Sequence, residues 1–171
     1  VALKNLDTDR PFQIVVYGTP AEETLGSKCD MIKKGCFHDL DVAFMMHGGP
    51  NTCTDVRCLA QRSFHVTFHG KRAHAALAPD KGRSAFDALL AAFQGIEFLR
   101  EHVPDDVRMH YTVAKLPGPA NVVPAEAEGE FAIRSFSRKT LEGVCERFLD
   151  IIKGASLIAG VDYEIKEGTF F

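Results

Sequence analysis

Two adjacent carboxylates and one distant histidine are the side chains of this chain best suited to chemistry. Glu22 and Glu23 end the segment Gly18-Thr19-Pro20-Ala21-Glu22-Glu23, and His47 follows 24 positions after Glu23. Adjacent carboxylates repel each other, and a bound metal ion commonly offsets that repulsion. One glutamate can then ligate the metal while its neighbour acts as a general base on a metal-bound water.

The Glu22–Glu23 pair and His47 are each predicted to follow a strand. The apolar run at 12–17 (FQIVVY) is typical of a strand buried on both faces, and a second such run at 42–46 (VAFMM) ends directly before His47. The carboxyl ends of parallel strands meet at one edge of a sheet, where ligands bind. Carboxylate and imidazole together suit zinc or manganese. A simpler interpretation stays open, in which Glu22 and Glu23 only favour a helix dipole and His47 is only hydrogen-bonded.

A helix is predicted between these two strands. Leu25, Cys29 and Ile32 recur at helical spacing, and Gly35 is placed to end the helix. Strand, helix and strand in this order indicate part of an α/β layer. We therefore predict that residues 1–60 are a partial catalytic α/β domain.

The pattern changes after residue 60 and predicts a second domain at 61–171. Apolar and polar residues alternate around 63–69, 107–113 and 127–133, as in half-buried strands, and 161–165 reads as a last strand. Ser84 and Ser137 are suited to cap helices. The predicted apolar stripes are Phe86, Leu89, Leu90, Phe93 and Ile96 in the first helix, and Leu141, Val144, Phe148, Ile151, Ile152 and Ala155 in the second, which Gly160 ends. The resulting order β-α-β-β-α-β is the ferredoxin-like arrangement.

The histidines of this second domain allow several interpretations. His65 and His69 stand four positions apart, which on a strand is about 13 Å at ~3.3 Å per residue, so they cannot share one ion. We expect them to lie on the solvent side of the strand. The segment 69–74 (HGKRAH) is basic and contains a glycine, so it either binds an anion or forms a solvated turn.

Two polar residues further along the chain are also candidates. Asn121 lies in the rigid loop 118–124 (GPANVVP), where turn chemistry alone accounts for its presence. Arg134 is predicted on the strand face opposite Phe131. It can bind a carboxylate bidentately, or it can balance the charge of Glu126, Glu128 and Glu130.

Composition excludes several classes of protein. Hydrophobic residues make up 46% and charged residues 25%, which excludes a disordered tail, and no apolar run approaches the ~20 residues of a membrane span. A net charge of −3 argues against a general nucleic-acid binder. Five cysteines without a Cys-x-x-Cys pair indicate reduced thiols, so we expect a cytoplasmic protein. The chain starts with Val1 and no signal peptide, and we expect it to begin inside a longer protein.

Taken in order, these motifs resemble the di-metal aminoacylase and carboxypeptidase group of metallopeptidases. The resemblance is closest to its amidohydrolase subfamily of indole-acetyl-amino-acid and p-aminobenzoyl-glutamate hydrolases. The matching segments run through nearly the whole chain. They are GTPAEE (18–23), MMHGGP (45–50), FHGKRAHAALAP (68–79), GRSAFDALL (82–90), GPANVVP (118–124) and AIRS (132–135).

The resemblance implies a function and a role for each matched residue. It implies hydrolysis of an amide bond in a small N-acyl amino acid or dipeptide by water activated on two divalent metal ions, zinc or manganese. The remaining ligands are expected outside this chain, which alone would then be inactive. The implied dimer forms through the lid domain at 61–171. The resemblance implies that Glu22 is the general base and that Glu23 and His47 are metal ligands. His74 corresponds to a lid histidine that reaches the partner's active site and stabilises the carbonyl oxygen there. Asn121 and Arg134 correspond to residues that bind the substrate.

Two other classes of function remain as alternatives. Residues 61–171 could form a non-catalytic ferredoxin-like binding or oligomerisation module, because that fold serves many unrelated tasks. The basic residues Lys71, Arg72, Lys81 and Arg83 suggest an anion- or nucleotide-binding protein, but no Gly-rich phosphate loop accompanies them.

Overall fold

The chain forms two compact units, Val1–His47 and Gly48–Phe171. This is a computed structural model, and it describes residue 5 and residues 9–168. Residues 48–59 contain no helix or strand and precede the first strand of the second unit. Within the described residues, no helix is long and apolar enough to cross a membrane.

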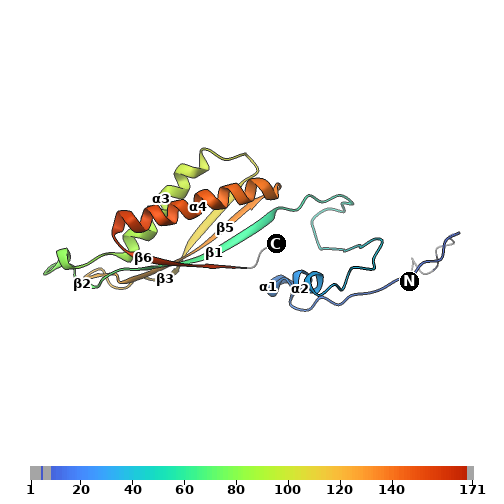
Figure 1. Ribbon diagram of the computed structural model, residues 1–171, viewed down its shortest axis with the longest axis horizontal. Helices are drawn as coiled ribbons and strands as arrows, with labels where there is room; N and C mark the ends of the chain where they lie inside the picture. Colours follow the sequence, from blue (N-terminus) through green and yellow to red (C-terminus); the bar gives the residue numbers. More distant parts are fainter. Residues whose placement is uncertain (1–4, 6–8, 169–171) are drawn as a thin grey trace. The chain divides into compact units, whose positions relative to one another are not determined.

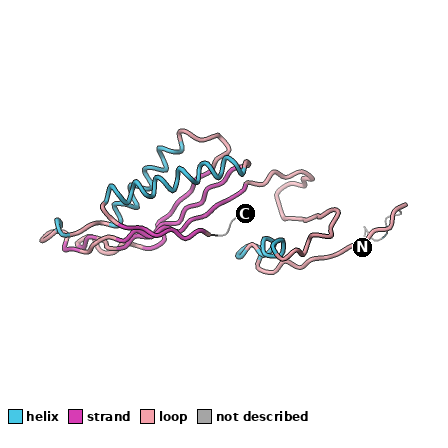
Figure 2. Tube along the Cα trace, viewed as in Figure 1, coloured by secondary structure: helices cyan, strands magenta, loops and turns pink. Residues whose placement is uncertain are grey.

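The second unit is an antiparallel sheet with two long helices on one face (Figures 1 and 2). Its four strands are β1 (Ala60–His69), β3 (Arg108–Lys115), β5 (Glu126–Ser135) and β6 (Asp162–Glu167), arranged β3-β5-β1-β6. The helices α3 (Ala85–Arg100) and α4 (Arg138–Ala159) connect β1 to β3 and β5 to β6. The predicted β-α-β-β-α-β order is confirmed.

The core lies between the sheet and the helices because buried and more exposed residues alternate along β1 and β5. Phe64, Val66 and Phe68 of β1 are at most 2% exposed, whereas the residues between them face the open side of the sheet. Phe148 of α4 lies against this layer, with its ring centroid 4.8 Å from that of Phe64 and 5.1 Å from that of Phe131. Burial of such rings is the main driving force for joining the helices to the sheet.

The helix ends follow the predicted capping residues. The Ser84 hydroxyl accepts a hydrogen bond from the Asp87 amide at 3.1 Å, and the Ser137 hydroxyl accepts one from the Thr140 amide at 3.2 Å. Each bond satisfies an amide that the first turn leaves without a helical partner. Gly160 ends α4 in the left-handed conformation at φ 64°, where a side chain would be strained.

One part of the predicted packing of α3 is wrong. Leu90, which the sequence places in the apolar stripe, is 49% exposed, while the alanines Ala85, Ala88 and Ala92 are fully buried. The alanines share the core stripe with Leu89, Ile96 and Leu99, because α3 packs closely against its neighbours. At Gly95 a Cβ atom would lie 2.6 Å from the Cγ2 of Ile151 in α4. The rest of the predicted stripe is confirmed, since Leu89 and Ile96 are buried and Phe86 and Phe93 pack against the core.

A two-stranded ribbon was not predicted. Its strands β2 (Ala73–His74) and β4 (Val122–Val123) are antiparallel, and the 3₁₀ helix η2 (Pro79–Lys81) lies between them in sequence. Gly70 allows the chain to leave β1 for this ribbon, since a Cβ there would clash with the carbonyl oxygen of Arg83.

The first unit contains two short helices, α1 (Glu22–Leu25) and α2 (Ser27–Lys33). Gly26, left-handed at φ 60°, separates them, and Gly35 follows the second at φ 75°. The predicted strands at 12–17 and 42–46 are not formed. A strand needs a hydrogen-bonded neighbour, and neither segment pairs with another among the described residues. Both lack regular secondary structure and are open to solvent; Phe44, for example, is 89% exposed.

Candidate functional site

Glu23 and His47 meet in the first unit although 23 residues separate them in sequence. Oε1 of Glu23 lies 3.7 Å from Nε2 of His47, and both side chains are largely exposed. Two donors bound to one tetrahedral zinc at ~2.0–2.1 Å are about 3.4 Å apart, so this pair fits a shared ion after a small adjustment. Among the residues that the structure describes, no third histidine, cysteine or carboxylate joins them. The pair can therefore supply two ligands but not a complete metal site.

The Glu22 carboxylate is held at the start of α2. Its Oε2 accepts hydrogen bonds from the Lys28 amide at 2.9 Å and the Ser27 hydroxyl at 3.2 Å, and Nζ of Lys28 lies 3.1 Å from Oε1. The amide of Lys28, followed by its ammonium group and Ser27, keeps the pKa of Glu22 below its usual range against a smaller opposing effect of burial. Glu22 thus caps a helix, as the simpler interpretation expects, and is ionised as a general base must be.

The backbone beside these glutamates is strained. Ala21, which precedes α1, is left-handed at φ 57° and ψ 30°, and it is the one residue other than glycine with a positive φ in the described chain. Such a conformation is unfavourable for a residue with a Cβ and is often found at functional turns. The turn orients Glu22 and Glu23 in different directions, one toward α2 and the other toward His47.

His74 and Asn121 come together on the ribbon. His74 pairs with Val122 across β2 and β4, and the Ala75 amide donates to the Asn121 carbonyl at 3.0 Å. Nδ1 of His74 accepts hydrogen bonds from the amides of Ala76 at 3.2 Å and Leu77 at 3.3 Å. Because Nδ1 accepts, the neutral ring carries its proton on Nε2. The exposed His74 ring therefore presents an N–H donor to its surroundings.

Arg134 lies at the other end of the sheet. It pairs with Gln61 near the start of β1, whereas the ribbon follows His69 at the end of β1. His69 is eight positions after Gln61 along β1, which is about 26 Å at ~3.3 Å per residue. The structure therefore does not bring Arg134 to His74 and Asn121 within one chain.

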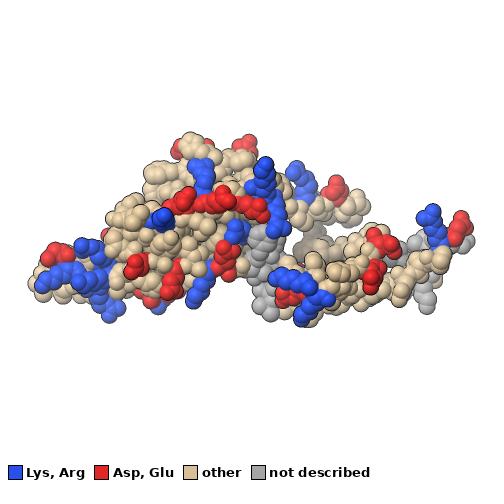
Figure 3. Space-filling view, viewed as in Figure 1, with Lys and Arg blue, Asp and Glu red and all other residues tan. Residues whose placement is uncertain are grey.

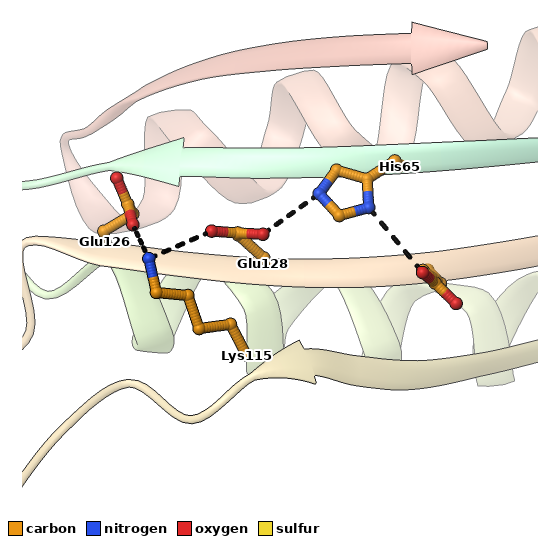
Figure 4. A network of polar contacts seen from close by, with 5 residues as sticks. His65, Lys115, Glu126 and Glu128 are labelled. Carbon is orange, nitrogen blue, oxygen red and sulfur yellow. Dashed lines mark hydrogen bonds and ion pairs between the residues drawn. The ribbon is translucent and has the colours of Figure 1, made fainter. Parts of the chain in front are cut away.

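A polar network on the open face of the sheet was missed by sequence reasoning (Figure 4). Nε2 of His65 lies 3.1 Å from Oε2 of Glu128, and Nδ1 of His65 lies 3.9 Å from Oε1 of Glu130. Nζ of Lys115 lies 2.6 Å from Oε1 of Glu126 and 3.4 Å from Oε1 of Glu128. Alternation places these residues on one face, but their pairing depends on strand register, which the sequence does not reveal.

This network bears on the two interpretations of Arg134. Lys115 and His65 are the partners of the β5 glutamates, and Lys115 lowers the pKa of Glu126 by its hydrogen bond. His69 contacts a different carboxylate, with its Nε2 3.8 Å from Oε1 of Glu164. Arg134 has no hydrogen bond or ion pair within the described residues. Charge balance for the glutamates therefore does not account for it.

Comparison with known proteins identifies the family of the second unit. A model described as a peptidase dimerisation domain matches residues 61–157. The chain belongs to the peptidase dimerisation domain family. This match begins one residue after the start of β1 and ends within α4, so it covers the ferredoxin-like sandwich except for its last strand, β6.

Individual similar proteins match most of the chain, and not only its peptidase dimerisation domain. The chain is 31% identical to the Xaa-Arg dipeptidase of Mus musculus over 96% of its own length and 38% of that protein. It is 35% identical to a p-aminobenzoyl-glutamate hydrolase chain of Escherichia coli strain K12, over 88% of this chain and 32% of that one. A crystal structure of an aminobenzoyl-glutamate utilization protein from Klebsiella pneumoniae is 26% identical with a TM-score of 0.59, covering 66% of this chain and 28% of that one. The chain thus spans less than two fifths of the length of these relatives.

Proposed function

We propose that the protein is a metal-dependent amidohydrolase that cleaves the amide bond of a small N-acyl amino acid or dipeptide. In this proposal residues 1–60 are part of the catalytic domain, and residues 61–171 are the lid and dimerisation domain. The names of the relatives support it, since they include a dipeptidase, a p-aminobenzoyl-glutamate hydrolase and an indole-3-acetyl-aspartic acid hydrolase. Each of these names describes a hydrolase whose substrate contains an amino acid.

The approach of Glu23 to His47 is the observation that carries this proposal. Their donor atoms are 3.7 Å apart, at a separation suited to one zinc or manganese ion. They would hold one of two divalent ions, together with ligands from outside this chain. The bound metal supplies Lewis acidity and lowers the pKa of a coordinated water.

The other site residues act on the water and the substrate. Glu22, ionised by its hydrogen bonds to Lys28, accepts a proton from the attacking water. The Nε2–H group of His74 donates to the oxygen that becomes negative in the tetrahedral intermediate, with Asn121 beside it on the ribbon. Arg134 grips the carboxylate of the amino acid.

The separation within one chain argues for a homodimer. A substrate the size of a dipeptide cannot span the roughly 26 Å of strand between the end that carries Arg134 and the end that carries the ribbon. We infer that His74 and Asn121 complete the site of a second copy, which pairs through the domain at 61–171. The family description as a dimerisation domain supports this assembly. Five free cysteines support a cytoplasmic location.

A non-catalytic ferredoxin-like module is the second candidate. It is favoured by the core of the second unit, which is complete without residues 1–47, and by the lack of a third metal ligand among the described residues. In that case the full-length protein binds no metal stoichiometrically and hydrolyses no N-acyl amino acid.

The experiment uses the full-length protein and its metal content. We expect bound zinc or manganese, hydrolysis of N-acyl amino acids, and loss of activity with chelators. Glu23→Gln and His47→Ala should each lower the metal content, while Glu22→Gln should keep the metal and lose activity. Glu146→Gln, at an exposed glutamate of α4, is the matched control. Full activity in Glu22→Gln would exclude Glu22 as the general base, and unchanged metal content in the other two would exclude this metal site.

A further inference from the structure

A row of three polar side chains crosses the open face of the sheet at one end. Arg134 of β5 pairs directly with Gln61 of β1 on one side and with Arg108 of β3 on the other. Residues that pair across antiparallel strands point to the same face, and their Cα atoms are about 4.5–5.5 Å apart. Ile133 and Met109, the neighbours of these arginines, are buried under the helices. The two arginines therefore project together from the face that no helix covers.

Two arginines in this position repel each other unless an anion lies between them. The β5 glutamates on the same face are paired with His65 and Lys115, further along the sheet (Figure 4). On the face of the molecule seen in Figure 3, Lys and Arg side chains are interspersed with Asp and Glu side chains. A negative group from solution would remove the repulsion.

The carboxylate of Asp106 interacts electrostatically with Arg108 but is already engaged in hydrogen bonds. Oδ2 of Asp106 accepts hydrogen bonds from the Ser135 hydroxyl and the Phe136 amide, both at 2.8 Å. Nη1 of Arg108 donates to the carbonyls of Asp105 and Val107, which anchors its guanidinium and leaves Nη2 and Nε for a ligand. Arg134 makes no hydrogen bond or ion pair with any residue described in the structure.

We propose that Arg108 and Arg134 together bind the two carboxylates of an acidic amino acid, so that the substrates are N-acyl conjugates of glutamate or aspartate. This rests on the proposed function, in which Arg134 holds the α-carboxylate, and it adds Arg108 as the group that selects the side chain. Guanidinium groups bind carboxylates bidentately, which gives two oriented contacts. A substrate that releases arginine would bring a third guanidinium beside these two and is disfavoured. The pair thus favours the specificity named for p-aminobenzoyl-glutamate hydrolase over that named for Xaa-Arg dipeptidase.

The test compares N-benzoyl-glutamate, N-benzoyl-glutamine and N-benzoyl-arginine as substrates of the metal-loaded, full-length protein. Glutamine matches glutamate in shape but lacks the second charge. We expect kcat/KM to be about 10- to 100-fold higher for the glutamate conjugate, the range for one hydrogen bond to a charged group. Arg108→Gln should remove this preference by raising KM for the glutamate conjugate alone. Arg134→Gln should slow the glutamate and glutamine conjugates alike, and Lys153→Gln, at an exposed lysine of α4, should change neither.

A binding measurement separates this inference from the proposed function. Calorimetry with glutarate, and with its monoamide as control, reports the two-carboxylate site even in a protein that hydrolyses nothing. We expect glutarate to bind more tightly than the monoamide, and Arg108→Gln to abolish the difference. Equal binding of the two compounds, equal turnover of the glutamate and glutamine conjugates, or preference for the arginine conjugate would each overturn the inference. Circular dichroism of the exposed-site variants verifies that they fold.

Discussion

The packing of α4 on the sheet leads to a quantitative prediction about Phe148. This residue is 1% exposed, and its ring lies against those of Phe64 and Phe131. Phe98 of α3 is 63% exposed and offers the same side chain in a different environment. We expect Phe148→Ala to lower the free energy of unfolding by about 3–5 kcal/mol and Phe98→Ala by less than about 1 kcal/mol.

The magnitude for Phe148 has two sources. Removing a fully buried ring forfeits its transfer free energy of about 1.5–3 kcal/mol. Two aromatic contacts, at centroid distances of 4.8 and 5.1 Å, add about 0.5–1.5 kcal/mol each. The loss is a large part of the roughly 5–15 kcal/mol that stabilises a typical domain. The Phe148→Ala protein should therefore fold but unfold at a much lower urea concentration.

Urea unfolding followed by far-ultraviolet circular dichroism measures this effect, since the chain contains no tryptophan for fluorescence. The slope of the free energy against urea concentration should stay the same in both variants, because the surface exposed on unfolding is nearly unchanged. Similar losses of stability for Phe148→Ala and Phe98→Ala would refute the assignment of Phe148 to the core and the orientation of α4 on the sheet.

Three further predictions concern single ionisable groups. Burial is the main cause that raises the pKa of Cys145 to about 11. A thiol reagent should therefore label the exposed Cys53 at once and Cys145 only after unfolding, as measured by mass spectrometry of the labelled peptides. Labelling of both cysteines at the same rate would contradict this. The hydrogen bond from Arg100, with a smaller one from Tyr111, lowers the pKa of Glu97 to about 2. Its stabilising effect should therefore be complete above the ordinary pKa of about 4.5 and be lost as the pH falls toward 2, so the difference in melting temperature between the wild type and Glu97→Gln should close over that range. His74 should be in the Nε2–H tautomer, which nitrogen chemical shifts measure; a proton on Nδ1 would contradict the turn geometry.

The sandwich could be predicted from sequence because its signals are local. Alternation in β1 placed Phe64 and Phe68 in the core, and both helix caps are single hydroxyls directly before an apolar stripe. Each of these features acts within a few residues, so neighbouring sequence is sufficient to specify it.

The first unit could not be predicted in the same way because strands depend on partners. The run at 12–17 has the composition of a buried strand, yet it pairs with no other strand among the described residues. Composition shows what a segment can bury, whereas a hydrogen-bonded neighbour decides whether it forms a strand. The break at Gly26 is a similar case, since the helical spacing continues across it while the backbone turns left-handed.

The residues of the candidate site also differ in whether local sequence is sufficient to predict them. Glu22, Glu23 and His47 could be selected by residue type, because carboxylate and imidazole are common metal ligands. The meeting of Arg108 with Arg134 could not, because 25 residues lie between them and only the register of β3 against β5 makes them neighbours. A slip of that register by one residue would move Arg108 to the helix side of the sheet, where an unpaired guanidinium cannot be buried without a large penalty. The burial of Met109 between Arg108 and His110 therefore fixes the register and, with it, the pairing of the two arginines on the open face.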